Sequence, residues 1–404
     1  MIDSMFVNYF ADDRRPIPLN LAFARVIIGV WLIWKTAMYD WHTLLAAPVM
    51  QTSEFAWAIP PIAPGLILEF ERLLLIAVLI GFMVGYRIKL TAFSAALITA
   101  HLGTVRMTQI TSGETESLFI GVYFLILFGL FADTDELSVD GIRRATNQPL
   151  PRLRERLATQ DLDYPHPALR WWLLIVALIY FGSGFDKVFH QGITSPSLAF
   201  ARPQNLPRWM QFFRPDGPVQ FLAEFPVIMQ LGALGALGLE LGFLAAVLAG
   251  ITVTPFMIGL IAFTALNVML LGIHFVDVYF FVLVFAAWDG GVARLQSSET
   301  IDVVYDDTSR PTVLAAVVLA MCDANDTVQF TPGSTELAPE VSFAISTGDQ
   351  SYSGIAAVCV VCRHFRFLVP IAWMFERSIT RRASAALVRT YRLRRRNNLH
   401  QTEK

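Results

Sequence analysis

The sequence contains a series of apolar segments, each close to the length needed to cross a lipid bilayer. A helix of about 20 mostly apolar residues spans the hydrocarbon core. Only Gly272 separates the last two segments, so seven spans are an alternative to eight. The sequence therefore predicts a mainly α-helical, polytopic transmembrane bundle. The eight segments are Leu19–Met38, Leu66–Gly85, Ile88–Met107, Ser117–Phe131, Arg170–Phe185, Val227–Gly250, Thr252–Leu271 and Ile273–Trp288.

The composition agrees with a membrane protein. Of the 404 residues, 55% are hydrophobic and 16% are charged, whereas soluble domains carry about 25% charged residues. A net charge of −2 gives no overall field that would attract nucleic acid. The three cysteines are too few for a disulfide-rich secreted scaffold. The N-terminus shows no apolar signal-peptide core, so we expect the first span to direct insertion.

The chain divides into four regions by composition. Residues 1–18 form a polar N-terminus, 19–290 hold the apolar spans, 299–376 are mixed, and 377–404 are rich in Arg. Within 299–376, strand-like and helix-like segments alternate, which predicts a small α/β domain. The basic tail either lies on anionic lipid or is solvated.

Basic residues in the connections predict the orientation in the membrane. If the N-terminus is cytoplasmic, Arg87, Lys89 and the arginines of 143–156 all lie on the cytoplasmic side. With eight spans, the C-terminus is then cytoplasmic as well. The expected location is the cell membrane.

Lys187 is the leading candidate for a functional residue, because it ends an otherwise apolar segment. An ionisable group inside a membrane is a functional hypothesis by default. Desolvation lowers the pKa of a lysine, which allows it to act as a base near neutral pH. The alternative is that Lys187 extends to the headgroups, as long basic side chains do at helix ends. The neighbouring carboxylate of Asp186 favours the charged ammonium.

Arg25 and Glu240 are ionisable residues within other apolar segments. An unpaired buried charge costs several kcal/mol, so we expect each to have a partner inside the bundle or to line a polar cavity. We include Asn267 and His274 among the candidates for the same polar environment. No metal site is expected, and the residues do not identify a cofactor.

The apolar region resembles the horizontally transferred transmembrane (HTTM) domain family, which includes the vitamin K-dependent γ-glutamyl carboxylase. The resemblance covers roughly residues 19–290, and Asn267 lies where the family often has Asn. It rests on motifs in a shared order: Leu21-Ala22-Phe23-Ala24-Arg25, Gly85-Tyr86-Arg87, Leu137-Ser138-Val139-Asp140-Gly141, Tyr180-Phe181-x-x-Gly184-x-x-Lys187 and Glu240-Leu241-Gly242-Phe243.

In the carboxylase, the resemblance implies, the lysine at the position of Lys187 deprotonates reduced vitamin K. In family members without carboxylase activity, an equal alternative is that this lysine anchors helix packing. The implied substrate class is a lipid or a quinone-like molecule. The chain lacks histidine at two places where the family often has it. Glu114–Ser117 occupies the first of these places and Thr264 the second. The large lumenal and propeptide-binding portions of the animal carboxylase are also missing, so we do not expect carboxylation of protein glutamates.

The mixed region resembles the DCC family of thiol-disulfide oxidoreductase-like proteins, which implies a thioredoxin-like fold. That family has Tyr-Asp-Gly-x-Cys-x-x-Cys after its first strand. Here Ser309 and Thr312 occupy the cysteine positions, and a hydroxyl cannot replace an attacking thiolate. We expect the redox site to be lost. Cys359 and Cys362 lie in an apolar helical run and are expected to be core thiols, with a redox or metal role as the alternative.

Two functions follow from these observations, and the residues leave open whether the chain is an enzyme. The first is a membrane enzyme acting on a lipid or quinone-like substrate, with Lys187 as base. The second is a non-catalytic scaffold that uses its DCC-like domain to bind partners. A transporter is a third reading, without the broken helices or repeats typical of one. The expected partners are the lipid bilayer and a small lipid or quinone, not nucleic acid.

Overall fold

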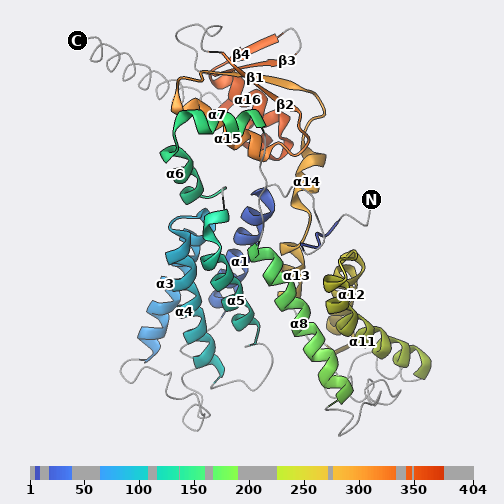
Figure 1. Ribbon diagram of the computed structural model, residues 1–404. Coiled ribbons are helices and arrows are strands. Elements are labelled where there is room, and N and C mark those ends of the chain that lie inside the picture. The colour runs from blue at the N-terminus through green and yellow to red at the C-terminus, as the bar shows by residue number, and fades with distance from the viewer. Residues whose placement is uncertain are drawn as a thin grey trace. The chain divides into compact units, whose positions relative to one another are not determined.

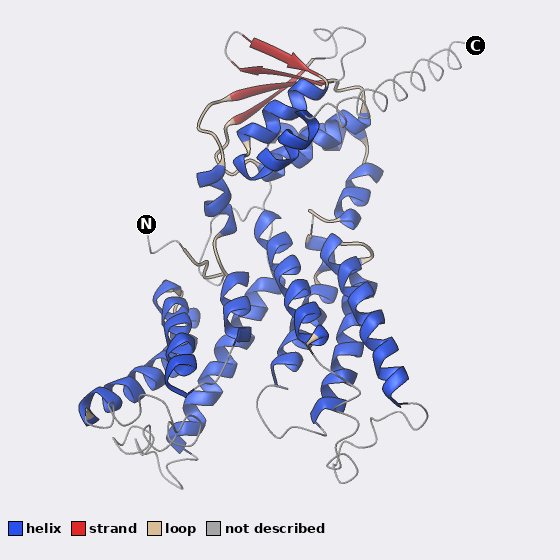
Figure 2. Ribbon diagram, turned by 180° about the vertical axis from the view of Figure 1, so that it is seen from behind, coloured by secondary structure: helices blue, strands red, loops and turns tan. Residues whose placement is uncertain are grey.

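The computed structural model describes residues 5–9, 18–38, 64–107, 116–135, 137–159, 167–189, 225–271, 276–333, 343–347 and 350–376. These residues are mainly helical, with one small sheet near the C-terminus (Figure 2). They form two compact units. The first comprises Met1–Arg14, Asn20–Asp140 and Pro165–Ala287, and the second comprises Arg15–Leu19, Gly141–Tyr164 and Trp288–Lys404. His274 and the basic tail 377–404 lie outside the described residues.

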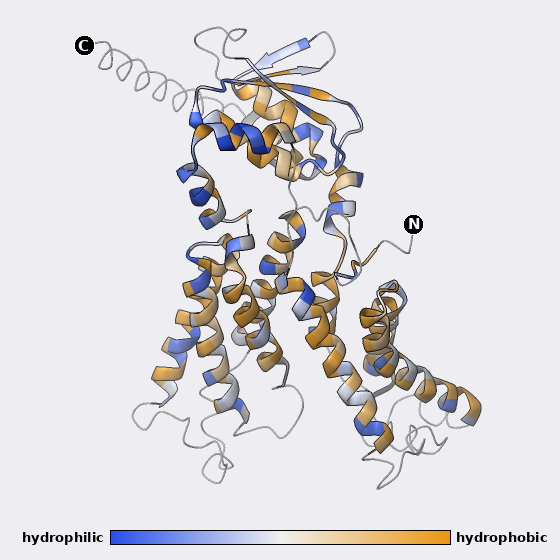
Figure 3. Ribbon diagram, viewed as in Figure 1, coloured by the Kyte–Doolittle hydropathy of each residue, from blue (hydrophilic) through white to orange (hydrophobic). Residues whose placement is uncertain are grey.

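The first unit consists of apolar helices (Figures 1 and 3). Among the described residues, four segments are long and apolar enough to cross a membrane: Leu19–Ala37, Ile88–Arg106, Pro167–Phe189 and Pro226–Leu248. They belong to α1, α4, α8 and α11. The helices are α1 (Pro18–Ala37), α3 (Pro64–Val84), α4 (Ile88–Met107), α5 (Glu116–Leu130), α8 (Pro167–Phe189), α11 (Pro226–Leu248), α12 (Thr254–Leu271) and α13 (Val276–Val284).

The remaining predicted spans are helical but shorter or more polar than a typical membrane-crossing helix. Helix α3 carries Glu69, Glu71 and Arg72 near its start. The apolar parts of α5 and α12 are Leu118–Leu130 and Thr254–Met269. The eighth predicted segment ends early, because α13 stops at Val284 and a separate helix, α14 (Trp288–Leu295), follows.

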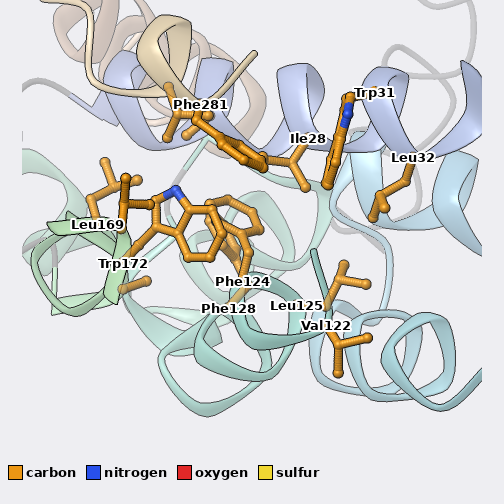
Figure 4. Close-up of a cluster of buried hydrophobic side chains, with 14 of the residues drawn as sticks. Ile28, Trp31, Leu32, Val122, Phe124, Leu125, Phe128, Leu169, Trp172 and Phe281 are labelled. Atoms are coloured by element: carbon orange, nitrogen blue, oxygen red, sulfur yellow. The ribbon is translucent and has the colours of Figure 1, made fainter. Parts of the chain in front are cut away.

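Large aromatic side chains join the helices of the first unit (Figure 4). The Phe281 ring from α13 meets Trp31 of α1 edge-on at 5.1 Å and Trp172 of α8 at 5.8 Å, measured between ring centroids. Phe124 of α5 packs against Trp172 at 5.0 Å. Edge-to-face contacts at such distances add to the free energy of burial. The core therefore connects α1, α5, α8 and α13.

The turn between α3 and α4 is fastened to the loop that follows α5. Gly85 has a φ of +73°, and a Cβ added there would lie 2.3 Å from Ser138 Cβ. The Gly85 carbonyl accepts a 3.0 Å hydrogen bond from Asp140 N–H. The Asp140 carboxylate in turn accepts a 2.7 Å hydrogen bond from the Ile88 N–H, which satisfies a free donor at the start of α4. Only glycine combines this backbone conformation with so close a contact.

The second unit combines a mixed sheet with helices. The strands are ordered β2-β1-β3-β4. β1 pairs in parallel with β2 and antiparallel with β3, and β3 pairs antiparallel with β4. The elements are α6 (Val139–Asn147, joined to the first unit at its start), α7 (Leu150–Thr159), α14, β1 (Ile301–Tyr305), α15 (Arg310–Cys322), β2 (Val328–Pro332), β3 (Phe343–Thr347), β4 (Gln350–Ser353), α16 (Ile355–His364) and α17 (Val369–Glu376).

Alternating apolar residues explain the central strand. Ile301, Val303 and Tyr305 of β1 are buried, while Asp302 is exposed. Ile301 and Val303 pack in one core with Phe365, which follows α16. The predicted small α/β region is therefore present as a sheet with covering helices. The short polar strand β4, which has little apolar alternation, was not predicted.

A cluster of buried polar side chains lies at the N-terminal end of β2. The Asp323 carboxylate accepts hydrogen bonds from the Val328 N–H at 2.7 Å and from the Gln296 side chain. His364 Nε2 lies 2.9 Å from Thr327 Oγ1 and 3.3 Å from the Gln296 amide nitrogen. Because that amide nitrogen can only donate, we assign His364 Nε2 as an acceptor. Burial lowers the pKa of His364, and the charges of Asp323 and Glu299 oppose this shift.

We expect Gly85→Ala to destabilise the protein by about 1–3 kcal/mol, because the new methyl group overlaps Ser138 in an unfavourable backbone conformation. Thermal unfolding of the purified protein in detergent measures this effect. Gly182→Ala is the matched control, since no atom lies within 4 Å of its added Cβ. Equal melting temperatures for the two variants would contradict the role of Gly85.

We expect the stability of the second unit to fall as the pH decreases below the unfolded pKa of histidine, about 6.5. The folded pKa of His364 is lowered, so the unfolded chain binds more protons between the two pKa values, and stability is lost as the pH falls through this window. Urea unfolding monitored across this pH range tests the effect, and His364→Gln should flatten the profile. If the free energy of unfolding of His364→Gln had the same pH dependence as that of the unmodified chain, His364 would not be the cause of the effect.

Candidate functional site

Lys187 forms a direct contact with Glu240. The Lys187 ammonium donates to both oxygens of the Glu240 carboxylate, at 2.5 and 2.7 Å, and to Ser183 Oγ at 2.9 Å. The Lys187 side chain is 18% exposed and that of Glu240 is 3% exposed. Two of the predicted candidates, from α8 and α11, are thus brought together in a buried ion pair.

Local sequence explains why the two helices approach so closely. A Cβ added at Gly184 would lie 3.0 Å from Glu240 Cβ and 3.0 Å from a Leu241 methyl carbon, so glycine creates room for α11. Ser183 precedes Lys187 by four residues, and side chains at this spacing share one side of a helix. The Ser183 hydroxyl also lies 3.3 Å from Glu240 Oε1. The motif around Lys187 therefore supplies both the close approach and a second hydrogen-bond partner.

The ion pair determines what Lys187 can do chemically. A base needs a neutral amine, so Lys187 Nζ would first have to lose a proton. Glu240 Oε1 lies 2.5 Å from Nζ and is within reach to accept it. Asp186, next in the sequence, is exposed. Glu240 is a carboxylate in direct contact with Lys187.

Arg25 is buried and paired with Asp135. The two side chains are 3% and 1% exposed and form an ion pair. Arg25 also donates to the Met83 carbonyl at 3.0 Å and to the Leu137 carbonyl at 2.9 Å. It therefore joins α1 to the end of α3 and to the loop after α5. Sequence reasoning missed Asp135, although an acidic residue directly after an apolar segment is a usable signal for the partner of a buried arginine.

A second lysine–carboxylate pair was also missed. Lys35 of α1 forms an ion pair with Asp277 of α13, with side chains 10% and 16% exposed. The Trp31 indole N–H donates to the same carboxylate at 2.6 Å. Both residues lie within predicted apolar segments, and ionisable residues in such segments are expected to be paired. This rule, applied to every span, would have found them.

Asn267 does not belong to the Lys187 site. Asn267 lies half-buried in α12, and among the described residues no hydrogen bond links it to Lys187, Glu240 or Arg25. His274 lies outside the described residues. Among the residues that the structure describes, no group of three or more His, Cys, Asp or Glu side chains could hold a metal ion.

Ser309 and Thr312, the positions that we predicted to be degenerate redox sites, lie at the end of the β1–α15 loop and in the first turn of α15. Ser309 precedes α15, and the Thr312 hydroxyl donates to the carbonyls of Asp306 and Ser309, at 2.6 and 2.7 Å. Helix α7 and its preceding turn contact the same loop. Arg154 Nε donates to the Asp307 carbonyl at 2.9 Å, and Arg310 donates to the Gln148 carbonyl at 2.7 Å. The loop therefore serves as a contact surface.

Cys322 and Cys362 have raised thiol pKa values. Among the described residues, neither they nor Cys359 form a disulfide bond. Burial, together with the charge of Asp323, raises the pKa of Cys322 to about 11, and burial also raises the pKa of Cys362. Reactive cysteines instead have lowered pKa values, because the thiolate is the attacking species. The environment of Cys322 and Cys362 thus disfavours redox chemistry.

Comparison with protein-family models, with curated proteins and with solved structures finds no match for this chain.

We expect Asp135→Asn to destabilise the protein by about 3–5 kcal/mol, because it leaves the buried charge of Arg25 without its counter-ion. Removing both charges, in Arg25→Gln/Asp135→Asn, should cost less than the sum of the two single substitutions. Unfolding of the purified variants in mixed micelles measures the three values. Strict additivity would show that the two side chains do not interact.

Proposed function

We propose that the chain is a multi-pass membrane protein of the HTTM, vitamin K-dependent carboxylase-like family, with eight spans or seven. Contacts between the motif segments support this proposal. Arg25 bonds to the backbone just before Gly85 and just after the α5 end, at Leu137. Lys187 contacts Glu240, which begins the Glu-Leu-Gly-Phe motif. The second unit, with its mixed sheet and helices, would be a degenerate thioredoxin-like domain.

The proposed activity is that of a membrane enzyme acting on a lipid or quinone-like substrate. The observation that carries it is the Lys187–Glu240 contact, in which a proton donor and a proton acceptor are 2.5 Å apart and largely shielded from water. In this mechanism Lys187 passes one Nζ proton to Glu240. The neutral amine then removes a proton from an acidic hydroxyl of the substrate. A lipid-soluble substrate would reach Lys187 from the bilayer, and no cofactor is proposed.

A non-catalytic role as a membrane scaffold is the second candidate. The same bidentate ion pair favours it, because two charges held this closely stabilise a fixed arrangement of α8 and α11. The β1–α15 loop favours it as well, since it carries hydroxyl groups where a redox protein needs thiols and is in contact with α7. In this role the second unit would bind a protein partner.

The proposed location is the cell membrane, with both termini in the cytoplasm. Arg87 and Lys89 at the α3–α4 turn and the basic side chains of α6 and α7 support this orientation, because cytoplasmic connections carry an excess of Lys and Arg.

Substitutions at Lys187 separate the two functions. We expect both Lys187→Ala and Lys187→Arg to abolish the ability of the gene to complement its own deletion, because arginine keeps the ion pair but does not release a proton. Gly182→Ala, on the same helix, should complement fully. Rescue by Lys187→Arg alone would contradict a base and support the scaffold.

Mass spectrometry of the extracted purified protein identifies the substrate class directly. We expect a neutral lipid or quinone to co-purify with the unmodified chain and with Gly182→Ala. Co-purification of bulk phospholipid alone would count against a bound quinone.

A further inference from the structure

Helix α17 has one face that packs into the second unit and another that is exposed. A helical turn, Arg366–Leu368, runs directly into α17, so the two form one helical stretch. Leu368 packs against the core that includes Phe365, and Ala372 is 1% exposed. These positions follow one another at a spacing of three or four residues, which places them on one side of a helix. Packing within the unit therefore accounts for the inner face of α17.

The outer face of α17 is apolar and begins with a positive charge. Val369 is 43% exposed and Trp373 is 54% exposed, and Pro370, between them, is exposed as well. Arg366, three residues before Val369, is also exposed. The spacing of these four residues places them on one helix face. A tryptophan beside aliphatic residues and an arginine suits the membrane–water interface, because the indole favours the headgroup level and the guanidinium binds anionic headgroups.

The sequence around the outer face is strongly basic. Between Ile355 and Arg396 there are ten arginines and one acidic residue, Glu376. One of these arginines, Arg363, is exposed in the last turn of α16. Eight of them follow α17 in the sequence. Clusters of basic residues are attracted to anionic lipid. Because this charge coincides with an exposed apolar face, it fits a bilayer surface better than a purely electrostatic partner.

We propose that the outer face of α17 docks on the surface of an anionic lipid bilayer. Trp373 and Val369 enter the headgroup level, and Arg366 binds lipid phosphates. Burial of apolar area and attraction to anionic lipid act together in such reversible attachment. The docking gives the second unit a lipid contact of its own, in addition to the apolar helices of the first unit. It does not depend on a catalytic role for Lys187.

Fluorine NMR of the full chain in lipid nanodiscs tests the docking. The tryptophans are replaced by fluorotryptophan, and the Trp373 resonance is identified by its loss in Trp373→Phe. One set of nanodiscs contains phosphatidylcholine alone, and the other also contains about 30% phosphatidylserine. A lipid with a nitroxide near its headgroup broadens signals at the bilayer surface, and a water-soluble gadolinium chelate broadens solvated ones. We expect the nitroxide lipid to broaden the Trp373 signal, and the chelate to spare it, chiefly in the anionic nanodiscs.

Arg366→Gln should lower the ratio of docked to undocked chains by about fivefold, the contribution of one basic side chain near an anionic surface. The matched control is Arg152→Gln, at an exposed arginine of α7 in the same unit, which should leave the Trp373 signal unchanged. Equal effects of the two substitutions would overturn the proposal.

Nitroxide broadening of Trp373 that is equal in the two lipids, or absent from both, would also overturn the docking. Where it is absent, the chelate identifies the alternative. A Trp373 signal broadened by the chelate would show a solvated face, and one shielded from the chelate would show a face covered by protein.

Discussion

Charge neutralisation away from water is the constraint on which the first unit depends. Moving a charged side chain into a low-dielectric environment costs several kcal/mol unless a counter-ion accompanies it. In the described part of the unit, Arg25–Asp135, Lys35–Asp277 and Lys187–Glu240 satisfy this condition. Each pair joins segments that are distant in the sequence. Apolar packing alone would allow several helix arrangements of similar free energy. The requirement that opposite charges meet selects among them.

Arg25 and Lys187 are both paired with carboxylates, but the two basic side chains differ in their other hydrogen bonds. Arg25 bonds to two backbone carbonyls in addition to Asp135, which suits a permanently charged guanidinium that fixes a junction. Lys187 instead donates hydrogen bonds to a carboxylate and to a hydroxyl. An amine can lose its proton, whereas a guanidinium does not. The chemistry of the side chain, more than its burial, thus separates the two sites.

The lengths of the apolar segments predicted most of the helices, and the alternation of apolar and polar residues predicted strand β1. Both are local properties of the sequence. Local reasoning also identified Lys187, Glu240 and Arg25 as charges in need of partners. It did not predict which partners they would find, since Asp135 and Glu240 are brought in by helices that pack in three dimensions. The early end of α13 was also missed, because the apolar run continues beyond Val284 and hides the break before Trp288.

The second unit draws on two distant stretches of the chain, and this has a consequence for its biosynthesis. Leu153 and Leu157 of α7 are buried, and α7 packs against α15. During translation, these leucines leave the ribosome long before α15 has been made. Until α15 has been translated, these apolar side chains of α7 lack one of their packing partners. The native contacts of α7 are therefore completed only late in synthesis.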